Sequence, residues 1–348
     1  SYTGSYGLNA QWTVWNGGQR LNTIKQQKLN KETAELTVNE QENTLQEEIT
    51  KLYVQILYAD ESVRINEGTL ELSKAQYERG KELLAAGDIS KSELAQLESQ
   101  VSNDNYQLVT AQTSLENYKL QLKQLLELDG DREFTLAIPE LDETNVLSPL
   151  PAKADIYNTA LALRPEIQSS RLNIQSADLS ISMAKAGYLP NVSLTAGIGT
   201  NHTTGSDFTF SEQVKRGWNN SIGLSVSLPI FSNRETKSAV EKAKIQRESR
   251  QLDLTNAQKE LYRTIETMWL DASSAQQQFV AADAKLKSSQ SSYELVNEQF
   301  KLGMKNTVEL LTEKNNLMSA QQERVQAKYM AILNRVLLEF YAGNQIEI

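Results

Sequence analysis

An internal repeat constrains this chain more than any other feature: its two halves match at a constant offset of 216 residues, without insertion or deletion. The matching pairs include Gly7-Leu8 with Gly223-Leu224, Leu45 with Leu261, Tyr77-Glu78 with Tyr293-Glu294, Gly87 with Gly303 and Glu93-Leu94 with Glu309-Leu310. Such an offset indicates that one structural unit was duplicated and that the lengths of its elements are constrained. Tubes and spacers need constant lengths of this kind, whereas enzymes rarely do.

The composition predicts very long helices on both sides of a proline-containing centre. All six prolines lie between residues 139 and 229, and the flanking stretches are rich in Gln, Glu, Lys, Leu, Ala and Ser. One proline inside a helix costs roughly 3 kcal/mol, so long helices require proline-free stretches of this kind. Apolar residues spaced by threes and fours over 19–86, and again over 233–302, are typical of supercoiled helices. At 1.5 Å per residue, each helix would be about 100 Å long.

Each long helix is followed by a glycine and then by a shorter helix of similar pattern. Gly87 and Gly303 stand where helices prefer glycine at their C-terminal end, and we expect return helices over 88–126 and 304–342. The predicted domain organisation is a first repeat over 1–126, a linker over 127–153 and a second repeat over 154–348, which opens with an amphipathic helix over 154–186. The offset would place the counterparts of that helix and of the strand after it before residue 1. We therefore expect a helix and a strand upstream of this sequence.

Three short segments, 2–15, 188–200 and 218–231, alternate between apolar and polar residues. A period of two over about ten residues places one face of a strand in an apolar medium and the other in water. The apolar positions singled out are Tyr2, Tyr6, Trp12, Tyr188, Leu194, Trp218, Leu224 and Leu228. A soluble sheet on a core would explain the alternation, but each strand runs into a helix far longer than any sheet. A tilted barrel strand crosses a bilayer in about 9–11 residues, so we favour lipid as the apolar medium, with 201–217 as an external loop.

Several functional classes are excluded or disfavoured. The formal net charge of −9 argues against nucleic acid as a partner, and the absence of cysteine excludes disulfides and thiolate metal sites. The sequence contains no run of 18 or more apolar residues, so no transmembrane helix is predicted. No P-loop or Gly-x-Gly-x-x-Gly motif is present, and no catalytic constellation stands out, so we expect no enzymatic activity, no cofactor and no metal site. His202, the single histidine, is interpreted as a solvated loop residue.

Three elements of the sequence resemble the TolC-like outer-membrane efflux protein family. The first is the run Ala160-Leu161-Ala162-Leu163-Arg164-Pro165-Glu166-Ile167, which leads to Tyr188-Leu189-Pro190. The second is the strand-to-helix corner Leu228-Pro229-Ile230-Phe231-Ser232-Asn233-Arg234, matched by Val14-Trp15-Asn16-Gly17-Gly18. The third is the tip Phe300-Lys301-Leu302-Gly303, followed by Glu309-Leu310-Leu311. Together they cover the whole chain in the order that the family shows.

The resemblance implies an α+β fold in the outer membrane of a Gram-negative bacterium. Each chain of a homotrimer would give four antiparallel strands to a shared twelve-stranded transmembrane β-barrel, continuous with a long periplasmic α-helical barrel. The implied function is that of an exit duct in a tripartite efflux or type I secretion system, a passive channel opened at its periplasmic helical tip. Its implied partners are the lipid bilayer, a periplasmic adaptor (membrane fusion protein) and an inner-membrane RND or ABC pump.

The resemblance also implies roles for residues at the helical tips. Glu309 stands where the family places an acidic residue facing the aperture, and Lys305 and Phe300 stand where tip-locking contacts are made. Thr312 stands where a second acidic residue is common, so the resemblance supports only a single carboxylate ring. The tip residues implied in adaptor docking are Gly87, Gly303, Ser90, Leu94, Asn306 and Leu310.

Two alternatives remain open at this point. Glu309 is equally well read as an ordinary solvated glutamate on a helix surface. The whole chain could also be a soluble periplasmic coiled-coil scaffold or adaptor whose hairpins act as spacers. The strand faces discriminate between the two functions, because a soluble protein would bury their tyrosines, tryptophans and leucines inside a compact globule. No motif identifies the cargo or selects between the RND and the ABC pump.

Overall fold

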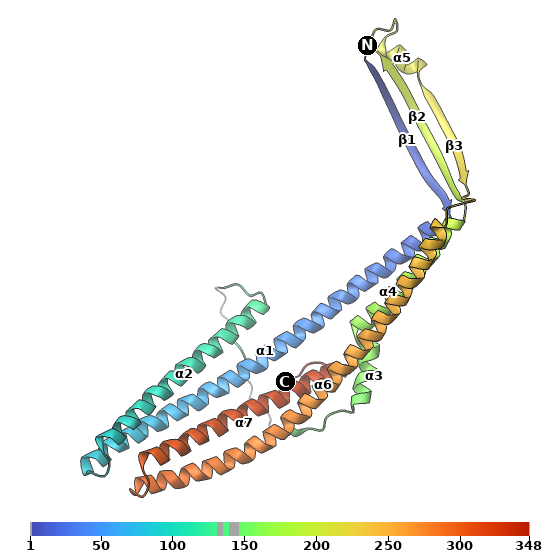
Figure 1. Ribbon diagram of the computed structural model, residues 1–348. Helices are drawn as coiled ribbons and strands as arrows, with labels where there is room; N and C mark the ends of the chain where they lie inside the picture. Colours follow the sequence, from blue (N-terminus) through green and yellow to red (C-terminus); the bar gives the residue numbers. More distant parts are fainter. Residues whose placement is uncertain (1, 131–134, 139–145, 348) are drawn as a thin grey trace. The chain divides into compact units, whose positions relative to one another are not determined.

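The computed structural model describes residues 2–130, 135–138 and 146–347, which are mostly helical with one small antiparallel sheet (Figure 1). The chain divides into two compact units. Unit 1 comprises Ser1–Glu40 and Arg164–Lys259, and unit 2 comprises Gln41–Leu163 and Glu260–Ile348. The helices α1 (Gln19–Ala86) and α6 (Glu235–Lys301) each begin in unit 1 and end in unit 2. The compact units therefore differ from the two sequence repeats.

The sheet of unit 1 contains three antiparallel strands in the order β1-β2-β3: β1 (Thr3–Asn16), β2 (Asn191–Thr203) and β3 (Asn219–Ser227). Trp12 pairs with Leu194, and Leu194 pairs with Leu224, so these three side chains lie on one face. The other members of this apolar face are Tyr6, Leu8, Ala10, Ala196, Ile198, Ile222 and Val226. The opposite face carries Ser, Thr, Asn, Gln and Gly.

The strand ends differ from those expected, for local reasons. Tyr188 belongs to the 3₁₀ helix η2 (Ala186–Tyr188), and Trp218 directly precedes β3. Leu228 follows the end of β3, next to Pro229, which has no N–H to give to a strand ladder. The segment 201–217 is not simply a loop, because β2 extends to Thr203 and is followed by the short helix α5 (Phe210–Arg216).

The single helix expected over 154–186 is two helices. These are α3 (Lys153–Leu163) in unit 2 and α4 (Pro165–Lys185) in unit 1. Between them, Arg164 has extended backbone angles (φ −69°, ψ 126°). A proline restricts the residue before it to such angles, and proline itself is well tolerated as the first residue of a helix. Pro165 therefore ends α3 and begins α4.

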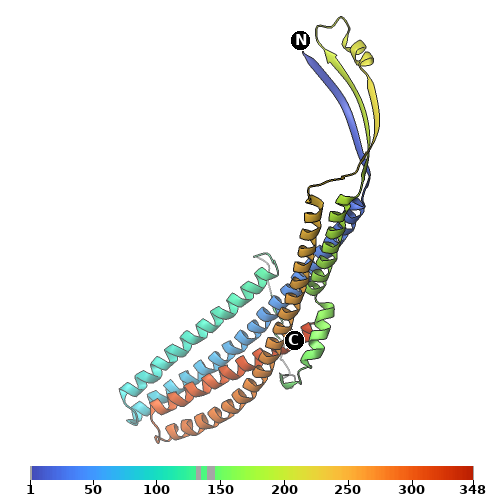
Figure 2. The ribbon, with the colours of Figure 1, turned by 45° about the vertical axis from the view of Figure 1, so that its right-hand side comes forward.

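Unit 2 is built from two antiparallel helical hairpins, which lie side by side in both views (Figures 1 and 2). The first consists of α1 and α2 (Lys91–Leu125), and the second consists of α6 and α7 (Thr307–Tyr341). Buried residues of α1 contact α2 through the cluster Ile56, Ala59, Val63, Leu115 and Leu122. Others contact α6 and α7 through the cluster Val54, Leu57, Ala275, Phe279, Val325, Ile332 and Val336. Helix α1 thus joins the two hairpins.

The part of the linker that precedes α3 is held to one side of α6. Trp269 donates its indole N–H to the carbonyl of Pro151 at 3.0 Å, and Gln276 donates to the carbonyls of Val146 and Ser148 at 3.1 and 2.8 Å. These side chains satisfy backbone carbonyls of a segment that lies outside the α-helices and the strands. Of the linker predicted over 127–153, residues 131–134 and 139–145 lie outside the described residues.

Candidate functional site

The two hairpin tips have the same backbone geometry. Gly87 and Gly303 both have positive φ, 85° and 71°. At the first tip the N–H of Asp88 bonds to the carbonyl of Leu83, and at the second the N–H of Met304 bonds to the carbonyl of Gln299. This six-residue closure with a left-handed glycine is the Schellman motif. Both tip glycines are thus required by the turn itself.

Each return helix then begins with a capping box. Ser90 caps α2 and Asn306 caps α7, and each side chain accepts a hydrogen bond from the backbone N–H of a glutamate three residues later, Glu93 or Glu309. Each glutamate in turn accepts a hydrogen bond from the N–H of its cap residue, at 2.8 and 3.1 Å. Local helix chemistry therefore gives Ser90, Asn306 and Glu309 defined positions at the tips.

Glu309 is engaged by its own helix start. Its carboxylate accepts a hydrogen bond from the Lys305 ammonium at 2.5 Å, in addition to the one from the N–H of Asn306. The hydrogen bond from Lys305, followed by that from Asn306, lowers the pKa of Glu309. The Thr312 hydroxyl donates to the carbonyl of Val308. Glu309 is therefore an ionised capping residue paired with a cation, and is not an isolated surface charge.

Two of the tip residues named from the sequence are buried within unit 2. Phe300 is 3% exposed and Leu310 is completely buried, and both pack with Leu83, Tyr293 and Leu317. Burial removes Leu310 from any surface that a partner could contact, so its assignment to docking is wrong for this structure. Leu94 is half-buried. The exposed apolar residues at the second tip are Leu302, Met304 and Val308, none of which was assigned a docking role from the sequence.

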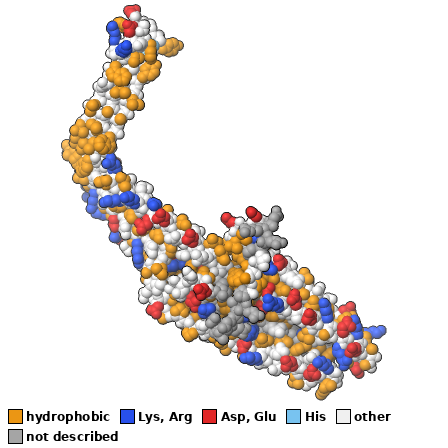
Figure 3. All heavy atoms as spheres, turned by 180° about the vertical axis from the view of Figure 1, so that it is seen from behind, with side chains coloured by type: hydrophobic (Ala, Val, Ile, Leu, Met, Phe, Trp, Pro, Cys, Tyr) orange, Lys and Arg blue, Asp and Glu red, His pale blue; other side chains and the backbone are white. Residues whose placement is uncertain are grey.

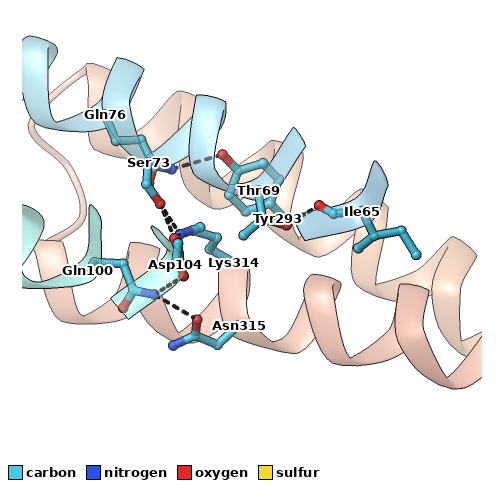
Figure 4. A network of polar contacts seen from close by, with 9 residues as sticks. All are labelled: Ile65, Thr69, Ser73, Gln76, Gln100, Asp104, Tyr293, Lys314 and Asn315. Atoms are coloured by element: carbon cyan, nitrogen blue, oxygen red, sulfur yellow. Dashed lines mark hydrogen bonds and ion pairs between the residues drawn. The ribbon is translucent and has the colours of Figure 1, made fainter. Parts of the chain in front are cut away.

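A buried ion pair, also missed from the sequence, connects the two hairpins (Figure 4). Lys314 of α7 and Asp104 of α2 are each 1% exposed, and the Lys314 ammonium bonds both to the Asp104 carboxylate and to the Ser73 hydroxyl of α1. The Ser73 hydroxyl also donates to Asp104, and Gln100 donates to the second oxygen of Asp104 at 2.8 Å. One network thus ties three helices together.

The same region contains a second polar contact between the hairpins. Gln76 of α1 donates its side-chain N–H to the Tyr293 hydroxyl of α6 at 2.9 Å (Figure 4).

Burial lowers the pKa of Lys314, and the hydrogen bond and charge of Asp104 oppose this lowering. Burying charges is costly unless they are paired and hydrogen-bonded, so separating α2 from α7 while Lys314 and Asp104 stay buried would be unfavourable.

The sequence did contain a signal for this network. Asp104 stands between Val101 and Leu108 at the three-and-four spacing of buried positions, and Lys314 stands between Leu310 and Leu317 at the same spacing. A charged residue at such a position predicts a buried polar partner. Neither spacing identifies the partner, because the two residues are 210 positions apart.

Both faces of the sheet are largely open in the single chain. On the apolar face Tyr6, Trp12 and Leu224 are exposed and Leu194 is half-buried. The three strands contain no Lys, Arg, Asp or Glu. In Figure 3 apolar side chains follow the strands, and the charged side chains at the far end of the sheet belong to the segment that contains α5. The apolar residues of the sheet therefore do not form the core of a compact globule.

The described residues offer neither a cluster of metal ligands nor a membrane-spanning helix. Within residues 2–130, 135–138 and 146–347, His, Asp and Glu do not gather in groups of three or more that could hold a metal ion. None of the helices in these ranges combines the length and the apolar character needed to cross a membrane. His202 lies in β2, where its ring contacts Phe210 at 5.0 Å between centroids, so it is not a solvated loop residue.

The Gly303 turn leads to a first prediction. We expect Gly303→Ala to destabilise the second tip by about 1–2 kcal/mol, because an L-residue in the left-handed region is strained. The measurement is hydrogen exchange of amides in 296–310 of the full chain. Gly68→Ala, in the exposed interior of α1, is the control and should stabilise its helix by up to about 1 kcal/mol. Equal exchange rates in both variants would show that the Gly303 turn is not strained by a side chain.

Comparisons with known proteins agree on one family. The family model described as "Outer membrane efflux protein" matches residues 1–127 and 156–344. The alkaline protease secretion protein AprF of Pseudomonas aeruginosa is 23% identical over 84% of this chain and 61% of its own length. The outer membrane protein TolC of Escherichia coli is 25% identical over 75% of this chain and 52% of its own length. The chain thus spans about half to three fifths of these two relatives. The structure of CusC matches with a TM-score of 0.84 and 19% identity, over 99% of this chain and 78% of CusC.

Proposed function

Because the chain belongs to the outer membrane efflux protein family, we propose that it is the exit duct of a tripartite efflux or type I secretion system. In this proposal the protein is a passive channel of the outer membrane, opened at its helical tips in the periplasm. The apolar, uncharged and exposed face of the sheet is the observation that carries the proposal. A face of this kind is stable when lipid covers it.

The proposed assembly is a homotrimer that shares one barrel of twelve strands and one barrel of helices. Apolar residues left exposed along α1 and α6 support this, since a single chain gives them no partner; they include Leu21, Ile24, Val38, Ile245 and Leu252. Association of copies would bury this surface. The matching caps of the two tips, 216 residues apart, support an origin of the two hairpins by duplication.

The proposed partners are a periplasmic adaptor and, through it, an inner-membrane RND or ABC pump. We place the adaptor contact at the tips, at Gly87, Ser90, Leu94, Gly303 and Asn306, and extend it to the exposed Leu302, Met304 and Val308. Exposed apolar residues beside polar caps are typical of docking surfaces. AprF is named for the secretion of alkaline protease, and the structures of CusC are described in terms of folding and transmembrane channel formation. A duct of this kind has no catalytic step to perform.

Pore formation tests the proposal against the soluble alternative. We expect the full chain to require detergent and, after reconstitution into planar bilayers, to form ion-conducting pores. A protein that is monodisperse in plain buffer and produces no conductance would favour the coiled-coil scaffold or adaptor. Chemical cross-linking of the same sample tests the trimer separately, because a dimeric or monomeric species would contradict it without touching the membrane assignment.

Two substitutions that change the charge at the second tip test the proposed gate. We expect Glu309→Gln to weaken cation selectivity and block by divalent cations, and Lys305→Gln to strengthen both, because Lys305 neutralises Glu309 in the ion pair between them. Current–voltage curves of reconstituted pores at low and high salt provide the measurement, and salt should weaken both effects. Glu298→Gln, on the exposed pair with Lys301, is the matched control. Unchanged curves in both tip variants would remove Glu309 from the aperture.

A further inference from the structure

The short helix α5 is folded back onto the apolar face of the sheet. The Phe210 ring meets Tyr6 edge to face at 6.3 Å between centroids and also contacts the His202 ring. Tyr6 pairs with Thr200, two residues before His202, so all these side chains share the face that carries Trp12 and Leu224. The Thr200 hydroxyl donates to the carbonyl of Val214 in α5. The helix therefore lies on the side of the sheet that we assign to lipid.

Side-chain and backbone bonds hold α5 in this place. Gln213 accepts a hydrogen bond from the N–H of Thr203 at 2.9 Å and donates to the carbonyls of Thr203 and Phe208, at 3.1 and 2.8 Å. Thr209 and Glu212 form a capping box at the start of the helix. Seven residues would not form a stable helix in isolation, so these contacts with β2 define its position.

The surface of α5 combines exposed aromatic rings with two cations. Phe208, Phe210 and Trp218 are each about half exposed. Lys215 and Arg216 form the last turn, and the Arg216 guanidinium lies 4.0 Å from the centroid of the Phe208 ring. Neither cation is in an ion pair with any residue that the structure describes. The carboxylate of Glu212 is turned instead to the start of the helix, where it accepts bonds from Thr209.

We propose that α5 is an interfacial anchor, which seats Phe208, Phe210 and Trp218 at the membrane–water boundary and binds phosphate groups of anionic lipids through Lys215 and Arg216. Aromatic rings prefer this boundary, and cations near it are attracted to anionic headgroups. The inference rests on the proposed membrane location of the sheet. It goes beyond that proposal by naming the lipid chemistry that the outer end of the sheet recognises.

The position of α5 along the sheet favours a lipid surface over a protein partner. The helix packs at the end of β1 where Tyr2 to Tyr6 lie, and the other end of β1 leads into α1. The strands between these ends have no charged residue, so Lys215 and Arg216 mark where the uncharged zone stops. An uncharged apolar band that ends in aromatic rings and cations is the arrangement expected where a membrane-spanning strand reaches the lipid headgroups.

Lipid quenching of a single fluorophore tests the anchor. The chain has no cysteine, so Ser211→Cys and, separately, Leu224→Cys each provide one labelling site in the full-length protein. The labelled proteins are reconstituted into phosphatidylcholine vesicles with and without phosphatidylglycerol, and quenched by spin labels placed either on the headgroup or deep in the acyl chain. We expect headgroup quenching at 211 and acyl-chain quenching at 224.

Charge removal then isolates the two cations. Phosphatidylglycerol should increase headgroup quenching at position 211. The double substitution Lys215→Gln and Arg216→Gln should abolish that increase, because the two cations together favour the membrane-bound form of α5 by up to about 30-fold. The matched control is the double substitution Lys74→Gln and Lys91→Gln, which removes the same charge from exposed positions of unit 2. It should leave the phosphatidylglycerol-dependent increase in quenching at position 211 unchanged.

The outcomes separate this inference from the proposed function. Acyl-chain quenching at 224 together with no headgroup quenching at 211, or with quenching at 211 that ignores phosphatidylglycerol, overturns the anchor and leaves the membrane sheet standing. Absence of quenching at both positions overturns the membrane sheet and the anchor with it. Quenching at 211 that depends on phosphatidylglycerol and on Lys215 and Arg216 supports both.

Discussion

Replacing Asp104 with asparagine is expected to lower the free energy of unfolding by about 3–5 kcal/mol, the usual loss when one partner of a buried ion pair is removed. The amide retains the shape of the carboxylate but has a single oxygen to accept hydrogen bonds, whereas Ser73 and Gln100 donate to different oxygens of Asp104. It also leaves the Lys314 ammonium buried without a counter-charge. The measurement is the midpoint and slope of chemical denaturation of the full chain in detergent, followed by helical circular dichroism.

The loss should shrink as the pH rises, because Lys314 can then release its proton. Without Asp104, only the lowering of the Lys314 pKa by burial remains. A folded-state pKa below the unfolded value of about 10.4 means that folding favours the neutral amine, so stability is gained as the pH rises towards that value. The variant is compared with the parent protein at each pH, because burial raises the pKa of Tyr293 and of Tyr329 in both.

Two controls show whether the loss comes from the unpaired charge. Asp104→Leu combined with Lys314→Met removes both charges and should recover most of the stability, since apolar residues often replace a buried pair without loss. Glu78→Gln removes one partner of the exposed pair with Lys81, and should change stability little because solvent screens that pair. An Asp104→Asn variant as stable as Glu78→Gln would contradict a role of the buried pair in holding the helices.

The second large effect is expected in the sheet. Leu224→Lys should make the free energy of folding into a lipid bilayer less favourable by about 2–4 kcal/mol, because a cation on a lipid-facing strand must leave water. The Leu224 side chain is exposed in the single chain, so the same change would cost almost nothing if water covered this face. The measurement is folding and unfolding of the full chain in vesicles as a function of denaturant.

The neighbouring residue provides a matched control. Ser225 is exposed and lies on the opposite face of β3, which we assign to the water-filled bore. Ser225→Lys introduces the same side chain one position away and should leave the free energy of folding close to that of the parent protein. Equal losses for the two variants would contradict the assignment of the apolar face to lipid and favour the soluble scaffold.

Local patterns explain what could be predicted from the sequence. The glycine turn and the capping box at each tip depend on residues within about ten positions of one another, so both tips could be recognised from the sequence. The family resemblance, drawn from three short elements, is confirmed by the family model that matches most of the chain. The Arg164-Pro165 break was also local, but the amphipathic pattern over 154–186 masked it, since it continues on both sides of the proline.

Long-range contacts explain what could not be predicted. Burial of Phe300 and Leu310 depends on Leu83 and Leu317 meeting them from other positions of the two hairpins. The position of α5 depends on Phe210 meeting Tyr6, which lies about two hundred residues earlier in the chain. Periodicity shows which residues share a face, but it does not show which face of a distant element covers them.

The buried ion pair has an evolutionary consequence for a chain that we propose to be duplicated. At the offset of 216 residues, the counterpart of Asp104 is Ala320, and the counterpart of Lys314 is Glu98. Two copies of the first half would bring an aspartate against a glutamate, and two copies of the second half would bring a lysine against an alanine. In the present chain the buried pair therefore forms only between the first half and the second half, because neither half carries both members of the pair at these positions.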